Sequence, residues 1–139
     1  MFLPQDIKNA SDIFREVAEN IDRLITVDLP FRSVSRRIYQ NARQKSERPL
    51  TLLAAERLLS AVRPERVVLI ATGWPDRPHI NSEIAETDGP PGAASLGMSL
   101  HRAENTVPIF LIETQLIEAM SVVATAAGFK ILPPDEALA

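Results

Sequence analysis

The sequence predicts an α/β fold, in which a mainly parallel sheet with helices on both faces forms a three-layer, Rossmann-like arrangement. Three apolar runs rich in β-branched or aromatic residues alternate with segments whose apolar residues recur at helical spacing. The order strand, helix, strand, helix, strand calls for parallel strands joined by crossover helices. We therefore expect one α/β domain over residues 1–139, with a helical lead-in over 1–64 and a βαβαβ unit over 65–139.

Three helices are expected in the lead-in. The first covers about residues 11–25, the second about 31–45, and the third 51–62. The second helix has an apolar side and an opposite side with three arginines: Arg32, Arg36 and Arg43. Such a basic face is usually solvated. The third helix is rich in leucine, and we expect its apolar side chains to be mostly buried.

The βαβαβ unit is predicted because the spacing of apolar residues changes after residue 64, from helical spacing to continuous apolar runs. Apolar runs predict strands at 67–71 and 107–112, and the segment 129–132 is expected to be a short third strand. Helical spacing predicts helices at about 91–103 and from Thr114 to the residues before Gly128. Three parallel strands are few for a sheet that has to be covered on both faces. We therefore expect either that the chain is a fragment of a longer domain or that a partner completes the sheet, most simply a second copy in a two-fold homodimer.

The loop over residues 73–90 is the predicted site. Ligands of parallel sheets bind beyond the carboxyl ends of the strands, and this loop is longer than ordinary connections. Proline disfavours the α conformation in the residue before it, so we expect the next helix to begin no earlier than Pro91, with Pro90 at its N-cap. The amides of Gly92, Ala93 and Ala94 would then be unpaired at the positive end of the helix dipole.

An open helix N-terminus beside carboxylates suits a ligand with both an anionic and a cationic group. The candidate catalytic residues are Glu86 and Asp88. The candidate substrate-binding residues are Thr72, Gly73, Thr87, Gly89, Gly92, Ala93 and Ala94. Asp88 has a second interpretation as a helix cap, although Pro90 and Pro91 lack the amides that it would cap. Trp74 is either a wall of the pocket or an ordinary packing residue.

Composition excludes several classes of function. The net charge of −3 argues against general binding of nucleic acid, and the absence of cysteine excludes thiolate metal sites and thiol nucleophiles. No apolar run approaches the roughly 20 residues of a membrane span, and the N-terminus does not resemble a signal peptide. We expect a cytoplasmic protein that binds a small ligand with an anionic and a cationic group and needs no cofactor. A divalent metal at Glu86 and Asp88 stays open as an alternative.

Three segments together resemble a known family. They are Val68-Leu-Ile-Ala-Thr-Gly-Trp74, Glu86-Thr-Asp-Gly-Pro-Pro-Gly-Ala93 and the apolar run 107–112. They are similar to the D-glutamate cyclase family, and the segments 20–25 and 50–56 add support. The resemblance covers nearly all of this chain and corresponds to the amino-terminal half of the family domain, which is about twice as long.

The resemblance implies a carbon–oxygen lyase that interconverts D-glutamate and 5-oxo-D-proline plus water. Ring closure needs a base for the ammonium group, an acid for the departing hydroxyl, and stabilisation of the oxyanion. Glu86 or Asp88 would act on the ammonium group, and Thr72 or Thr87 would donate a hydroxyl hydrogen bond. The alternative function is a non-catalytic α/β module that binds a small anion or completes a sheet with a partner chain.

Overall fold

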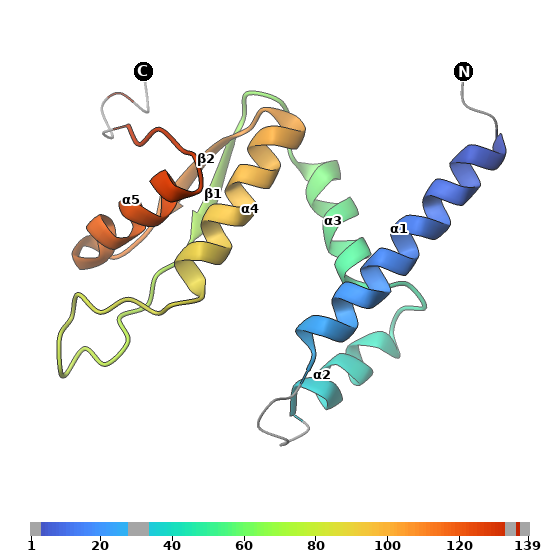
Figure 1. The fold of residues 1–139 in the computed structure, drawn as a ribbon, viewed down its shortest axis with the longest axis horizontal. Helices are drawn as coiled ribbons and strands as arrows, with labels where there is room; N and C mark the ends of the chain where they lie inside the picture. Colours follow the sequence, from blue (N-terminus) through green and yellow to red (C-terminus); the bar gives the residue numbers. More distant parts are fainter. Residues whose placement is uncertain (1–3, 28–33, 133–135, 137–139) are drawn as a thin grey trace. The chain divides into compact units, whose positions relative to one another are not determined.

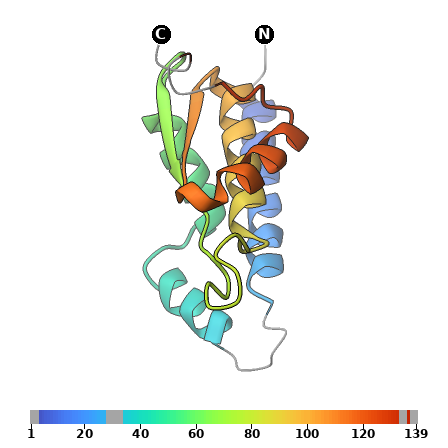
Figure 2. The ribbon, with the colours of Figure 1, turned by 90° about the vertical axis from the view of Figure 1, so that its left-hand side faces the viewer.

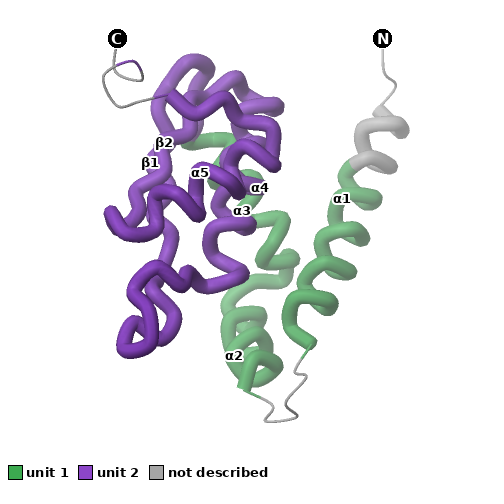
Figure 3. Tube along the Cα trace, turned by 60° about the vertical axis from the view of Figure 1, so that its left-hand side comes forward, with its two compact units in different colours: residues 1–61 green, residues 62–139 purple. Residues whose placement is uncertain are grey.

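The structure is a computed structural model that describes residues 4–27, 34–132 and 136, with side chains from Ser11 onward. The chain divides into two compact units, residues 1–61 and residues 62–139 (Figure 3). The first unit contains three helices, and the second contains the sheet (Figure 1).

The helices of the first unit are α1 (Pro4–Ile25), α2 (Val34–Arg43) and α3 (Leu50–Ala61). Helix α1 begins seven residues earlier than expected, at a proline, which is tolerated in the first turn because its missing N–H would be unpaired there. Helix α3 begins and ends one residue before the predicted bounds. The predicted start of α2 at residue 31, and Arg32 of the basic face, lie outside the described residues.

A buried carboxylate joins the three helices. Asp22 of α1 is 1% exposed and accepts hydrogen bonds from the backbone N–H groups of Leu50 (2.7 Å) and Thr51 (3.0 Å). It also accepts from the hydroxyl groups of Thr51 and of Tyr39 on α2. The first amides of a helix have no partner within the helix, and a negative charge there is favourable. Asp22 therefore satisfies the N-terminus of α3 from another helix.

These contacts set the ionisation of both side chains. Burial raises the pKa of Asp22, but the hydrogen bonds from Thr51, Leu50 and Tyr39 outweigh burial and bring the pKa below its ordinary value of 3.8. Burial and the neighbouring Asp22 carboxylate raise the pKa of Tyr39. Asp22 is therefore an anion over the physiological pH range.

The expectation that the leucines of α3 are mostly buried was wrong. The described structure contains no buried residue in α3, and Leu58 and Leu59 are 37% and 47% exposed. The apolar side chains of α3 spread over a wide arc of the helix, whereas its contact with α1 covers one side.

The second unit is built around two parallel strands, β1 (Val67–Ala71) and β2 (Val107–Leu111). Their register pairs Val67 with Val107 and Ala71 with Leu111. Helix α4 (Gly89–Glu104) connects the strands, and the 3-10 helix η1 (Thr114–Leu116) and helix α5 (Ile117–Ala126) follow β2. The predicted mixed α/β class and the parallel pairing of the first two strands are confirmed.

Helices α4 and α5 pack on one face of this sheet (Figure 2). A Cβ atom on Gly97 of α4 would lie 3.1 Å from Phe110 Cζ and 3.3 Å from Ile70 Cδ1, so glycine allows the helix to approach the strands closely. Phe110 also packs against the buried cluster of Ala94 from α4 and Met120 and Ala124 from α5. This cluster is the core of the second unit.

The third predicted strand is absent from the described structure. Residues 129–132 form no strand, and Phe129 instead packs edge-on against Phe110 with ring centroids 5.5 Å apart. A short apolar run does not by itself distinguish a strand from a segment that fills a core. The predicted three-layer arrangement is not confirmed either. Four side chains on the other face of the two strands are exposed: Val67, Leu69, Val107 and Leu111.

No helix in the described part of the chain combines the length and the apolar character that crossing a membrane requires.

The Asp22 contacts generate a prediction about stability. Asp22→Ala leaves the amides of Leu50 and Thr51 without their acceptor, and we expect it to lower the free energy of unfolding by about 2–3 kcal/mol. Asp12→Ala is the control, because Asp12 is an exposed residue of the same helix. Urea unfolding followed by circular dichroism measures both. Equal stability of the two variants would contradict the capping role.

The same carboxylate predicts an acid dependence. A group with a lowered pKa in the folded state contributes stability above its ordinary pKa, and this contribution is lost as the pH falls through the lower folded value. The stability of the wild type should therefore fall below a pH of about 4. This component should be missing from Asp22→Ala, so the two unfolding free energies should converge in acid.

Candidate functional site

An open pocket of about 520 Å³ lies where β1 and β2 end. Thr72 N–H donates to the Leu111 carbonyl oxygen over 3.0 Å, which extends the strand pairing beyond β1. The pocket is lined by Ala71, Thr72, Gly73, Trp74, Glu86, Leu111, Ile112 and Glu113. It therefore occupies the carboxyl ends of two parallel strands, where ligands of such sheets bind.

The loop after β1 folds back on itself. Pro75 and Ala85 form an antiparallel bridge, and Asp76 N–H donates to the Ile84 carbonyl oxygen over 2.8 Å. Glu86 N–H donates to the Trp74 carbonyl oxygen over 3.0 Å. This pairing returns the chain to the end of β1 and holds Glu86 at the pocket.

The side chains of Glu86 and Thr72 both lie close to Gly89. A Cβ atom built on Gly89 would overlap Glu86 Oε1 and would lie 3.1 Å from Thr72 Oγ1. The backbone of Gly89 does not lie in the left-handed region, so the need for glycine here is one of space. The absence of a side chain at residue 89 allows the carboxylate and the hydroxyl group to come together at the start of α4.

The predicted start of this helix was wrong. Helix α4 begins at Gly89, and Asp88 occupies the N-cap with φ −108° and ψ −40°. The restriction before proline is a preference, and the rest of the helix overrides it. Prolines 90 and 91 fit the first turn, where amides have no partner within the helix.

The earlier start also overturns the expectation of open amides at residues 92–94. Gly92 N–H donates to the Asp88 carbonyl oxygen over 3.0 Å, which is the first turn of the helix. Ala93 and Ala94 lie beyond this turn, and their side chains are buried. Because Pro90 and Pro91 carry no N–H, the first turn of α4 offers few amide donors to an anion.

The structure brings only part of the predicted site together. Thr72, Gly73 and Glu86 line the pocket, and Gly89 lies against Glu86 and Thr72. Asp88 and Thr87 are exposed and are not among the lining residues. The side chain of Asp88 makes no capping hydrogen bond, which agrees with the argument that the prolines deny it a partner.

Five lining residues did not belong to the predicted set, and two of them, Trp74 and Glu113, have side chains that could bind a polar or charged ligand. Trp74 is 69% exposed and lines the pocket, which favours the pocket wall over a packing role. Glu113 is the second residue after β2, and its Oε2 accepts a hydrogen bond from Gln115 Nε2 over 2.6 Å. Ligands of parallel sheets bind beyond the carboxyl ends of the strands, and this holds for the second strand as well as for the first. The residues after β2 would therefore have identified Glu113.

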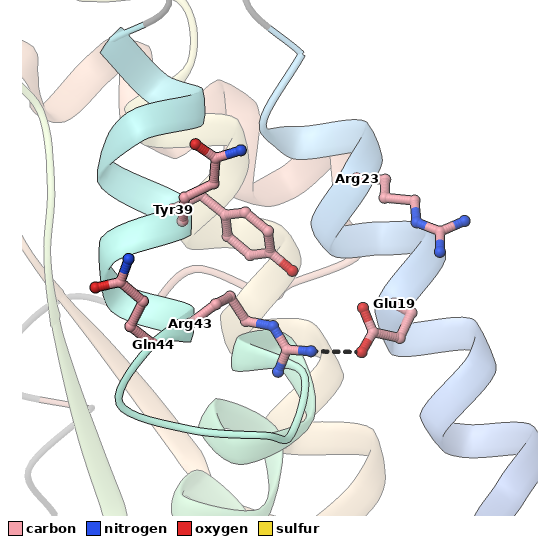
Figure 4. Close-up of a pocket in the computed structure, with 6 residues that line it drawn as sticks. Glu19, Arg23, Tyr39, Arg43 and Gln44 are labelled. Atoms are coloured by element: carbon pink, nitrogen blue, oxygen red, sulfur yellow. Dashed lines mark hydrogen bonds and ion pairs between the residues drawn. The ribbon is translucent and has the colours of Figure 1, made fainter.

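A larger open pocket, of about 600 Å³, lies in the first unit (Figure 4). It is lined by Glu19, Arg23, Tyr39, Gln40, Arg43 and Gln44. Arg43 is already paired with Glu19 at 2.7 Å, and the Tyr39 hydroxyl donates to Asp22. These polar groups hold α1 and α2 together, so the smaller pocket of the second unit remains the better candidate.

Within the described residues, no three side chains of His, Cys, Asp or Glu come together as a possible metal-binding group. Glu86 and Asp88 therefore have no third ligand of these types in that part of the chain.

Alanine substitutions at two glycines of α4 test whether the Glu86 carboxylate lies close to Gly89. A Cβ atom on Gly92 would meet nothing within 4 Å, whereas one on Gly89 would overlap the Glu86 carboxylate. Gly92→Ala should stabilise the chain by about 0.5–1 kcal/mol, which is the helix propensity difference. Gly89→Ala should lose this gain, because Glu86 has to move. Thermal and urea unfolding compare the variants, and equal stabilisation by both would contradict the close approach of Glu86.

Comparison with known proteins gives one match. A family model described as D-glutamate cyclase-like, C-terminal, matches residues 21–136. No curated protein and no solved structure matches the chain. The matched range contains both strands, helix α4 and all residues that line the pocket of the second unit. The chain therefore belongs to the D-glutamate cyclase-like C-terminal family.

Proposed function

We propose that this chain is a lyase that interconverts D-glutamate and 5-oxo-D-proline plus water at the pocket of the second unit. The observation that carries the proposal is that Glu86 and Thr72 both line the pocket and both lie close to Gly89, in a chain of this family. The pocket supplies a group for proton transfer and a hydrogen-bond donor within one site.

The reaction requires both kinds of group. The amine nitrogen forms a bond to the side-chain carboxyl carbon, and one carbon–oxygen bond of that carboxyl group breaks. The ammonium nitrogen loses two protons, and both leave with the departing oxygen as water. Glu86 accepts a proton from the nitrogen, as a general base. The Thr72 hydroxyl group donates a hydrogen bond to the oxyanion that forms on the attacked carbon.

The charge of the pocket favours the amine end of the substrate. Glu86 and Glu113 are acidic, and the lining contains no lysine or arginine. An ammonium group is attracted to these carboxylates and to the face of an aromatic ring such as Trp74. D-Glutamate carries this group, and 5-oxo-D-proline does not.

Replacement of Glu86 tests the proposed base. Glu86→Gln keeps the shape of the side chain and removes proton transfer, so kcat should fall by about 100- to 10,000-fold. Glu83→Gln is the matched control, because Glu83 is an exposed residue of the same loop outside the pocket. Chiral chromatography of D-glutamate and 5-oxo-D-proline measures conversion in both directions. An inactive wild type would refute the proposed function, and an active Glu86→Gln would refute the role of Glu86.

One observation favours a second candidate, a non-catalytic α/β module that completes a sheet with a partner chain. The exposed side chains of Val67, Leu69, Val107 and Leu111 form an apolar face on the two-stranded sheet. Parallel sheets are normally covered on both faces. The simplest partner is a second copy of the chain in a two-fold dimer, which pairs the same face of each copy.

This candidate predicts self-association through the exposed face of the sheet. Light scattering at micromolar concentration should return a dimer for the wild type and a monomer for Leu69→Glu, because a charge on Leu69 would be buried at the interface. Leu96→Glu is the control, since Leu96 is an exposed leucine of α4. A monomeric wild type, or a dimer that tolerates Leu69→Glu, would count against the dimer.

A further inference from the structure

A second acidic residue reaches the pocket from the other strand. The register pairs Ala71 with Leu111 at the ends of the two strands, and Glu113 is the second residue after β2. Glu86 enters the pocket from the loop after β1, and Glu113 enters from the end of β2. Two acidic residues from two different loops therefore line one pocket.

The Glu113 carboxylate does not cap the helix that follows it. Glu113 occupies the N-cap of η1 in an extended conformation, with φ −65° and ψ 141°, and its side chain makes no capping hydrogen bond. Its backbone carbonyl accepts the Leu116 N–H over 2.8 Å, and this contact does not involve the side chain. Gln115 Nε2 donates to Glu113 Oε2 over 2.6 Å and orients the carboxylate.

We propose that Glu113 is the second catalytic carboxylate of this site and shares proton transfer with Glu86. The inference rests on the proposed function. Ring closure moves two protons from nitrogen to the departing oxygen, so one group has to accept protons while another donates them. A nitrogen–carbon bond forms, a carbon–oxygen bond breaks, water leaves, and no atom is oxidised or reduced. Glu86 and Glu113 on two sides of one pocket provide these two groups.

The experiment replaces Glu113 and measures kcat, KM and the pH profile of the full chain. Glu113→Gln should lower kcat by about 100- to 10,000-fold, with a much smaller change in KM, and should remove one limb of the pH profile. Glu118→Gln is the matched control, because Glu118 is an exposed residue of the first turn of α5 and does not line the pocket. Glu118→Gln should keep the activity of the wild type and both limbs of its pH profile.

The outcomes separate this inference from the proposed function. An active wild type with an equally active Glu113→Gln would overturn the role of Glu113 and leave the lyase function standing. An inactive wild type would overturn both. If circular dichroism shows that Glu113→Gln is unfolded, the activity and pH profile of Glu113→Asp test the catalytic role instead. Partial activity with a shifted limb of the pH profile supports the catalytic role, and an unshifted profile overturns it.

Discussion

The parallel pairing of β1 with β2 is the constraint on which the candidate site depends. Parallel strands end at the same edge of the sheet, so the residues that follow them, Thr72 and Glu113, are brought to one pocket although they are far apart in the chain. Helix α4 makes this pairing possible, because parallel neighbours need a crossover connection. Close packing of Gly97 against Phe110 and Ile70 then holds the helix on the strands.

The position of Glu86 depends on a second constraint, which is space at the start of α4. The antiparallel pairing of Trp74 with Glu86 returns the loop to the end of β1, and Gly89 leaves room for the carboxylate beside Thr72. Residue 89 therefore contributes to the site by lacking a side chain. The pocket that results is acidic and carries an aromatic wall, which suits the ammonium group of a ligand better than the carboxylate that the open helix amides were expected to bind.

In the first unit, contacts between distant residues stabilise the fold. The segments 20–25 and 50–56, which support the family resemblance, meet through Asp22, Leu50 and Thr51. A buried carboxylate accepts the first amides of α3 from another helix, so these segments constrain each other through hydrogen bonds. These contacts give the two segments a role in stability, whereas Glu86, from the segment 86–93, lines the pocket.

The sequence by itself determined the local elements and the region of the site. Runs of β-branched residues identified β1 and β2, periodicity identified the helices, and the order of elements placed the pocket at the carboxyl ends, with Glu86 beside it. Only the tertiary structure decided where α4 begins, that Gly92 N–H is paired, that Phe129 fills the core, and that Glu113 reaches the pocket. Local preferences such as the restriction before proline are worth a few kcal/mol at most, and contacts between distant residues override them.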